Sequence, residues 1–152
     1  MSTPCYTTLT RQVEALFSGE DNLVAAMANF SALLNEHLDD INWVGFYLLQ
    51  GDQLVLGPFQ GKVACTRIPM GKGVCGTAAQ SDTTQRIEDV HAFDGHIACD
   101  AASNSEIVIP LRRDGQVIGV LDIDSPSFSR FDEADQLGLE SCVKSLEKAL
   151  FA

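Results

Sequence analysis

The fold is decided by the stretch Glu106-Ile107-Val108-Ile109-Pro110-Leu111-Arg112, followed by Arg113-Asp114-Gly115 and then Gln116-Val117-Ile118-Gly119-Val120-Leu121-Asp122-Ile123-Asp124. Two apolar, β-branched runs around an Asp-Gly turn are typical of an antiparallel hairpin. Side chains alternate along a strand, so Asp122 and Asp124 share a face. A three-residue loop would set Glu106 opposite Asp122, whereas a two-residue loop would offset the pairing by one. We favour the register that gathers these three carboxylates, because together they could do chemistry.

The segment that leads into this hairpin, residues 91–105, predicts a loop that carries function. It is rich in Gly, Asp, Ser and Asn, and Cys99 stands in its middle. Loops lie at the surface, and a partly exposed thiol is where thiolate chemistry takes place. Cys99 is therefore a candidate nucleophile, and the alternative is an ordinary surface cysteine.

Length and composition define the broad class of the chain. Its 152 residues fit one domain, expected to span residues 1–152, and 45% hydrophobic with 20% charged residues is usual for a globular protein. A net charge of -11 argues against nucleic acid and anionic membranes as partners. No apolar run approaches the roughly 20 residues of a membrane span, and the first residues lack a signal peptide. We expect a cytoplasmic protein.

The cysteine count favours redox chemistry over structural cross-links. The five cysteines stand at positions 5, 65, 75, 99 and 142. An odd number in a chain of this size favours free or redox-active thiols. A zinc site from Cys65, Cys75, Cys99 and a histidine (His91 or His96) is conceivable, but no CxxC or CxxH pair is present, so we expect no metal.

Helical periodicity appears at both ends of the chain. Residues 8–17 and a second run capped by Asp21 are expected to be helices, and Asp132 is expected to begin a C-terminal helix. Their inward positions are predicted to be Leu9, Val13, Leu16 and Phe17; Leu23, Met27, Phe30, Leu33, Leu34 and Leu38; and Leu137, Leu139, Val143, Leu146 and Leu150. Phe128 and Phe131, just before the last helix, are also expected in the core. These helices serve packing.

Strands are expected between the helical ends. Residues 41–49 and 53–60 predict a hairpin, residues 61–70 a short strand containing Cys65, and residues 84–90 a brief strand. Residues 71–79 predict a glycine turn that enters a helix, without the spacing of a nucleotide-binding loop. The fold class is therefore α+β, with a central antiparallel sheet of about six strands flanked by N- and C-terminal helices.

One face of the first strand has the residues of a ligand pocket. Trp43, Gly45 and Tyr47 alternate onto the same face, and the glycine could leave room for a small molecule between the two rings. The alternative is that both aromatic residues are ordinary core of the sheet.

Carboxylates, aromatic rings and thiols together indicate a reaction type. Crowded carboxylates cannot all ionise, so at least one should keep a proton near neutral pH, and they could also bind an ammonium group. This favours thiol attack on an electrophile whose oxygen must be protonated, after which a neighbouring cysteine resolves the oxidised thiol as a disulfide. Nearby carboxylates disfavour a thiolate, and a substrate ammonium would relieve this.

At these positions the chain resembles the GAF-domain free methionine-(R)-sulfoxide reductases. The resemblance covers roughly residues 41–131 and lies in Asn42-Trp43-Val44-Gly45-Phe46-Tyr47, Gly57-Pro58-Phe59-Gln60-Gly61, Cys65, Gly71-Lys72-Gly73-Val74-Cys75-Gly76, Asp94-Gly95-His96-Ile97-Ala98-Cys99-Asp100, Ser105-Glu106-Ile107-Val108-Ile109-Pro110 and Leu121-Asp122-Ile123-Asp124-Ser125. It implies a GAF-like fold and the reduction of free L-methionine-(R)-sulfoxide to L-methionine.

The resemblance also implies a role for each matched residue. Cys99 matches the nucleophile that becomes a sulfenic acid, Cys65 the principal resolving cysteine, and Cys75 a third cysteine that acts as a second resolver or relay. Trp43 and Tyr47 match pocket residues. Glu106, Asp122 and Asp124 match the acidic residues that hold the ammonium and activate the sulfoxide oxygen, with Asp124 as our choice of proton donor, assisted by Glu106.

The resemblance further implies thioredoxin as reductant, a homodimer and no cofactor. Two alternatives stay open: a ligand-sensing GAF module, and a thiol redox switch without turnover. A sensor needs no redox cysteine, so replacement of Cys99 by serine separates it from an enzyme.

Overall fold

The computed structural model describes residues 4–95 and 102–151, so Cys99 lies outside the described residues. Its helices are α1 (Tyr6–Phe17), α2 (Leu23–His37), α3 (Gly73–Ser81) and α4 (Glu133–Phe151), with a 3-10 turn η1 (Val90–Ala92). Its strands are β1 (Trp43–Gln50), β2 (Gln53–Gly61), β3 (Arg67–Pro69), β4 (Gln85–Ile87), β5 (Ser105–Arg113) and β6 (Gln116–Ser125). The predicted α+β class is confirmed.

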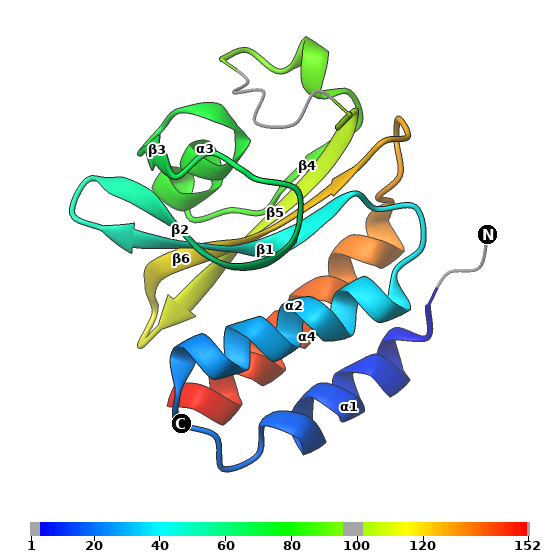
Figure 1. The fold of residues 1–152 in the computed structure, drawn as a ribbon, viewed down its shortest axis with the longest axis vertical. Helices are drawn as coiled ribbons and strands as arrows, with labels where there is room; N and C mark the ends of the chain where they lie inside the picture. Colours follow the sequence, from blue (N-terminus) through cyan, green and yellow to red (C-terminus); the bar gives the residue numbers. More distant parts are fainter. Residues whose placement is uncertain (1–3, 96–101, 152) are drawn as a thin grey trace.

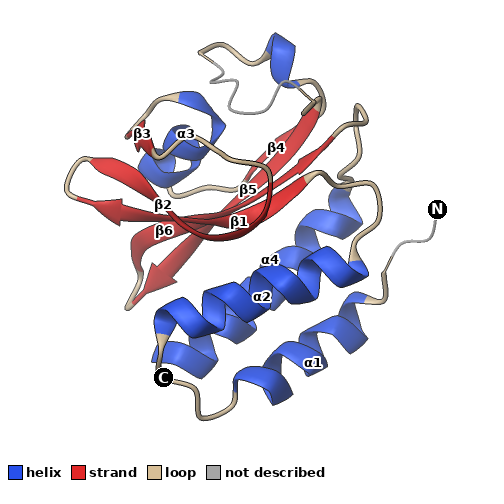
Figure 2. Cartoon of the chain, in the orientation of Figure 1, coloured by secondary structure: helices blue, strands red, loops and turns tan. Residues whose placement is uncertain are grey.

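The six strands form one antiparallel sheet in the order β3-β2-β1-β6-β5-β4. Helices α2 and α4 lie against one face, with α1 outside them, whereas α3 lies on the other face, next to the edge strand β3 (Figure 1; Figure 2). None of the helices within residues 4–95 and 102–151 is long and apolar enough to cross a membrane.

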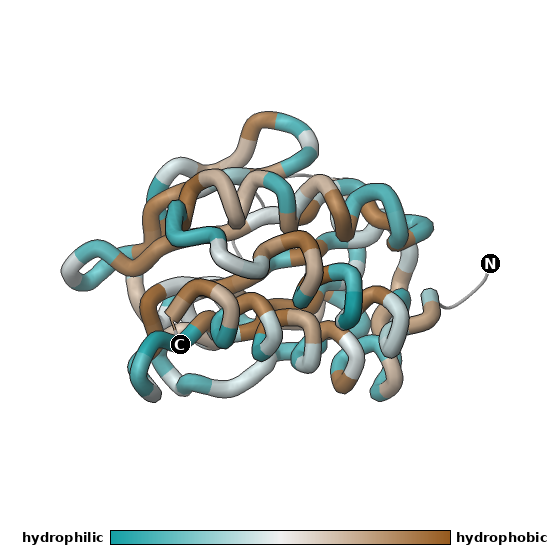
Figure 3. The backbone as a smooth tube through the Cα atoms, turned by 90° about the horizontal axis from the view of Figure 1, so that it is seen from below, coloured by the Kyte–Doolittle hydropathy of each residue, from teal (hydrophilic) through white to brown (hydrophobic). Residues whose placement is uncertain are grey.

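The sheet separates two apolar clusters. On β1, Val44 and Phe46 point into the cluster with α1, α2 and α4, whereas Trp43 and Tyr47 point into the cluster under α3. This is the alternation of a strand buried on both faces. Figure 3 shows apolar and polar segments alternating along the helices, as expected of elements with one buried side.

The β5–β6 register differs from the predicted one. Arg113 pairs with Gln116, so the loop has two residues, and both of them, Asp114 and Gly115, have positive φ angles of 53° and 77°. Such a turn matches the twist of the strands. Between Leu111 and Arg112 the register shifts by one, and Glu106 lies opposite Asp124, with Val108 opposite Asp122.

The prediction that Glu106 pairs with Asp122 is therefore wrong. The prediction that Glu106, Asp122 and Asp124 lie on the same face of the sheet is confirmed. A two-residue loop alone would have turned Glu106 to the opposite face from Asp122 and Asp124. The irregularity near Ile118 adds one residue to β6 and cancels that offset. The bulge thus restores the gathering of the three carboxylates.

Some local predictions need correction. Cys65 lies in the loop between β2 and β3 and not in a strand, and the cap of α2 is Asn22, whose Oδ1 accepts from Ala25 N at 2.9 Å, and not Asp21. The strand predicted over residues 84–90 is shortened to Gln85–Ile87.

Three residues predicted to lie inward are exposed: Leu16, Leu137 and Phe128. Leu137 stands two residues before buried Leu139, and two residues on a helix point to opposite sides. Leu16 lies on α1, the outermost helix, where only one narrow face is covered.

A buried polar cluster joins α1 to the start of α4. Asp132 directly precedes α4, one residue before the observed start of the helix, and its Oδ1 accepts from Asp135 N at 2.8 Å. Asp135 accepts from Tyr6 Oη at 2.6 Å and from Arg130 Nη1 at 3.3 Å. Both Asp135 and Arg130 are almost fully buried, so each ion depends on the other.

We expect Asp135→Ala to lower the free energy of unfolding by about 3 to 5 kcal/mol, because it leaves the Arg130 guanidinium buried without its carboxylate. Urea denaturation measures this loss. As a control, Asp82→Asn removes the exposed pair with Arg112 and should cost less than about 1 kcal/mol. Equal losses in the two variants would contradict the cluster's importance.

Candidate active site

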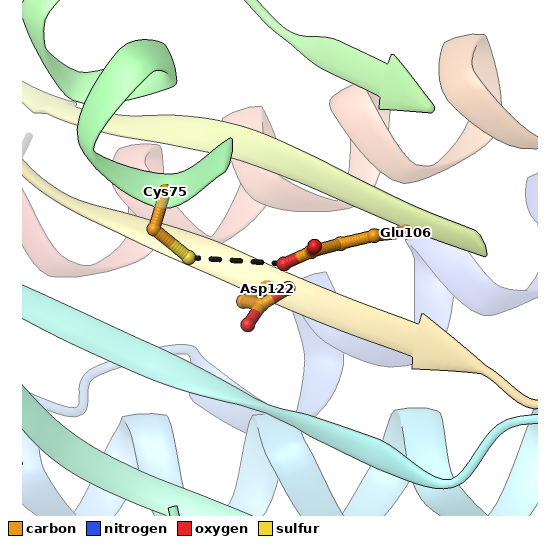
Figure 4. A group of neighbouring side chains, drawn as sticks. All are labelled: Cys75, Glu106 and Asp122. Carbon is orange, nitrogen blue, oxygen red and sulfur yellow. Dashed lines mark hydrogen bonds between the residues drawn. The ribbon is translucent and has the colours of Figure 1, made fainter. Parts of the chain in front are cut away.

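Three carboxylates from the β5–β6 hairpin form the floor of the site. Glu106 comes from β5 and is 7% exposed, and Asp122 comes from β6 and is 5% exposed. Asp124, opposite Glu106, is half-buried. Figure 4 shows the Cys75 thiol of α3 and the Glu106 carboxylate pointing toward each other, with the Asp122 carboxylate below them. The sheet thus brings together all three acidic residues predicted for the site.

These carboxyl groups are poorly placed to ionise. Burial, and then the charge of Asp122, raise the pKa of Glu106 well above its ordinary value. Burial, and then the charge of Asp124, likewise raise the pKa of Asp122. Asp122 Oδ1 is buried without a hydrogen-bond partner among the described residues. The cluster therefore keeps a proton at a higher pH than an exposed carboxyl would, as like charges in an apolar site require.

Cys75 faces the same carboxylates from the first turn of α3. The side chain is 4% exposed, and its thiol donates to Glu106 Oε2 across 3.9 Å. Burial, followed by the charges of Asp122 and Glu106, raises the pKa of this thiol. The thiolate is the nucleophile in disulfide chemistry, so Cys75 is a weak nucleophile in this state.

Cys75, Glu106 and Asp122 also form the one group among the described residues whose spacing could hold a metal ion, with their ligand atoms within 4.8 Å of one another. Metal binding would need the thiol and the carboxyls to lose their protons, which their raised pKa values oppose. The absence of a metal stays a prediction.

An aromatic wall stands beside the carboxylates. In the sheet, Trp43 lies opposite Asp124, and its ring stacks on Tyr47 at 5.9 Å and on Phe59 at 5.1 Å between centroids. Phe59 was not assigned to the site from sequence, although it lies within the matched motif 57–61. The feature that could have identified Phe59 is its position on the strand that pairs with β1.

Gly45 has a different role from the one predicted. A Cβ there would lie 2.2 Å from Phe59 Cβ, so the glycine makes room for β2 and Phe59 rather than for a ligand. The close approach coincides with the register shift between Gly45 and Tyr47 in the β1–β2 pair.

The polar atoms of the wall reach the loop that carries Cys65. Trp43 Nε1 donates to Lys62 O at 3.2 Å, and Tyr47 Oη donates to Cys65 O at 2.9 Å. Burial, and then the charge of Asp122, raise the pKa of the Tyr47 hydroxyl, so it remains a donor. The wall and this loop are therefore directly connected.

The cysteines differ in state. Cys65 takes part in a disulfide bond, whereas Cys5, Cys75 and Cys142 are free thiols. Cys142 is buried in the helical core beside Thr10, and Cys5 is exposed at the start of α1. Cys99, the predicted nucleophile, falls outside the described residues, so its position stays a prediction.

With this geometry in view, the chain can be compared with known proteins. Residues 26–150 match the family model of the GAF domain. The free methionine-R-sulfoxide reductase of Escherichia coli is 63% identical over 148 residues, which cover 97% of this chain and 90% of that protein. The fRMsr of Staphylococcus aureus, solved in complex with substrate, superposes with a TM-score of 0.94 at 54% identity, covering 99% of this chain and 98% of that one.

A third comparison agrees. The free methionine-R-sulfoxide reductase from Neisseria meningitidis, solved in complex with its substrate, gives a TM-score of 0.91 at 49% identity and covers 95% of this chain and 87% of that one. The chain is a GAF-domain protein. Within that class it belongs to the free methionine-(R)-sulfoxide reductase family, whose members are oxidoreductases.

The raised carboxyl pKa values predict a dependence of stability on pH. A group whose pKa is higher in the folded protein stabilises it fully below the unfolded value, about 4.3 for Glu, and this contribution is lost as pH rises through the folded pKa. We therefore expect Glu106→Gln to raise the free energy of unfolding at pH 8 by about 1 to 2 kcal/mol and to flatten its decline with pH.

Urea denaturation at pH 5 and pH 8 measures this effect. Glu36→Gln, at an exposed glutamate of α2, is the matched control and should follow the wild-type curve. Parallel pH curves for Glu106→Gln and the wild type would show that burial of Glu106 does not penalise its charge.

Proposed function

We propose that this chain reduces free L-methionine-(R)-sulfoxide to L-methionine through a sulfenic acid on Cys99 and a disulfide between Cys99 and Cys65, which thioredoxin reduces. The observation that carries the proposal is the pair of buried carboxyls, Glu106 and Asp122, which lie next to an aromatic wall and whose pKa values are raised, so that they keep a proton near neutral pH. The 63% identity to the Escherichia coli reductase and the likeness to two relatives solved with substrate support it.

The first step transfers the sulfoxide oxygen. The Cys99 thiolate attacks the sulfoxide sulfur, and the carboxyl cluster gives a proton to the sulfoxide oxygen. The bond between that oxygen and the methionine sulfur breaks, the oxygen ends on Cys99 as a sulfenic acid, and methionine is released. Asp124, half-buried opposite Glu106, donates the proton or polarises the sulfoxide oxygen with the help of Glu106, and the raised pKa of Glu106 and Asp122 keeps a proton in the site at neutral pH.

The second step resolves the sulfenic acid. The Cys65 thiolate attacks the Cys99 sulfur, a disulfide forms and water leaves, and a dithiol such as thioredoxin then reduces the disulfide. The oxidised state of Cys65, with Cys5, Cys75 and Cys142 free, supports this pairing. Cys75 is the weaker candidate resolver because its thiol is buried against Glu106.

The same cluster accounts for a preference for the free amino acid. An α-ammonium needs negatively charged partners, and the cluster of Glu106, Asp122 and Asp124 supplies them when its three carboxyls hold fewer than three protons, while the Trp43 ring packs on the methyl end of the substrate. A sulfoxide within a polypeptide has no ammonium to offer. A cytoplasmic location, a homodimer and one domain over residues 1–152 are part of this proposal.

We expect the reduced protein, given racemic free methionine sulfoxide and dithiothreitol, to consume only the R epimer and to release an equal amount of methionine. Chromatography that resolves the epimers measures this. N-acetylated methionine sulfoxide should react at least about a hundredfold more slowly, because a buried charged site is left unpaired. Consumption of neither epimer would refute the enzyme and favour a sensor.

We expect Cys99→Ser to abolish this turnover, because serine cannot form a sulfenic acid or a disulfide. Cys5→Ser is the matched control, since it makes the same change at an exposed cysteine of the N-terminus and should keep wild-type turnover. Unchanged turnover in Cys99→Ser would remove Cys99 from the mechanism.

A further inference from the structure

The loop between β2 and β3 is bonded to the aromatic wall at two points, and the end of β2 just before it also contacts the wall. At the end of β2, Gly61 packs on the Trp43 ring, and a Cβ there would lie 2.5 Å from Trp43 Cδ1. The carbonyl of Lys62 then accepts from Trp43 Nε1, and the carbonyl of Cys65 accepts from Tyr47 Oη. Two side chains of one strand thus hold the backbone on which Cys65 stands.

The wall itself is firmly placed. Strand β1 pairs with β2 on one side and β6 on the other, and Trp43 and Tyr47 are both almost fully buried. The loop, by contrast, has no helix or strand between Gly61 and Arg67, and Thr66 O is joined to Leu56 N at 2.9 Å. Within residues 62–66, the two side-chain hydrogen bonds from the sheet therefore act together with the disulfide bond of Cys65 and the backbone bond of Thr66. They are present whether or not the disulfide has formed only if the carbonyls of Lys62 and Cys65 keep their donors.

We propose that Trp43 and Tyr47 are positioning residues for disulfide formation, which hold the Cys65 backbone where its sulfur can reach an oxidised cysteine. This inference rests on the proposed function, in which Cys65 resolves the sulfenic acid. It adds a second task to two side chains assigned to substrate contact: their rings face the substrate, while their N–H and O–H groups set the place of the resolving cysteine.

The chemistry of resolution makes this positioning consequential. A disulfide forms only when the two cysteine backbones approach within a narrow range and the attacking thiolate lines up with the other sulfur. A loop without regular structure would meet that condition in a small fraction of its conformations, and each bond that holds Cys65 raises that fraction. Because backbone carbonyls accept both hydrogen bonds, these bonds orient the loop whatever the protonation state of the Cys65 thiol.

Tyr47→Phe tests the inference, because it removes one oxygen and keeps the ring. Reduced protein is mixed with one equivalent of free methionine-(R)-sulfoxide, and methionine and the Cys65 disulfide are followed in quenched samples by peptide mapping. We expect disulfide formation to fall behind methionine release by about fivefold to tenfold, the factor that one lost hydrogen bond implies. Dimedone should then trap the persisting sulfenic acid.

Tyr6→Phe is the matched control. It removes the same oxygen from a partly buried tyrosine, whose hydroxyl donates to Asp135 on the opposite side of the sheet. We expect disulfide formation to keep pace with methionine release in this variant. An equal lag in both variants would overturn the inference, because it would trace the effect to stability, and so would wild-type disulfide formation in Tyr47→Phe.

A second arm separates this inference from the proposed function. Diamide oxidises two nearby thiols to a disulfide and is itself reduced to the hydrazine, so it needs no sulfoxide. Tyr47→Phe should form the Cys65 disulfide more slowly than Tyr6→Phe with diamide as well. If the wild type releases no methionine, the reductase proposal fails, and the diamide rates still decide whether Tyr47 positions Cys65.

Discussion

The structure depends on the register of β5 against β6. A two-residue turn would by itself place Glu106 on the opposite face of the sheet from Asp122 and Asp124, and the extra residue near Ile118 reverses that. Because one face packs on α2 and α4, a carboxylate turned that way would enter an apolar core. The bulge therefore protects the helical core and creates the acidic site in one step.

The acidic site lies in the part of the protein where buried carboxyls reduce stability least. The cluster around α3 is the smaller of the two apolar clusters, and there Glu106, Asp122 and the Cys75 thiol are buried together, with their ligand atoms within 4.8 Å of one another. Burial disfavours their charged forms, which costs stability and at the same time provides a proton for chemistry. The larger cluster under the helices supplies the folding free energy that offsets this cost.

Much of the site could be predicted from the sequence, for identifiable reasons. Alternation along β1 and β6 put Trp43, Tyr47, Asp122 and Asp124 on one face, because a strand has a fixed period of two. Phe59 and the attachment of the Cys65 loop could not be predicted. They depend on the β1–β2 pairing, with its own register shift at Gly45, and on bonds to backbone carbonyls that any residue could offer.

The sequence by itself determined the helices, the central hairpin, the acidic and aromatic composition of one face, and the family, because these follow from local periodicity and from residue types at matched spacing. Only the tertiary structure decided that Glu106 lies opposite Asp124, that Cys75 is buried against Glu106, and that Leu137 and Phe128 lie at the surface. Each of these depends on a register or a packing partner far away in the chain, and no local pattern encodes either.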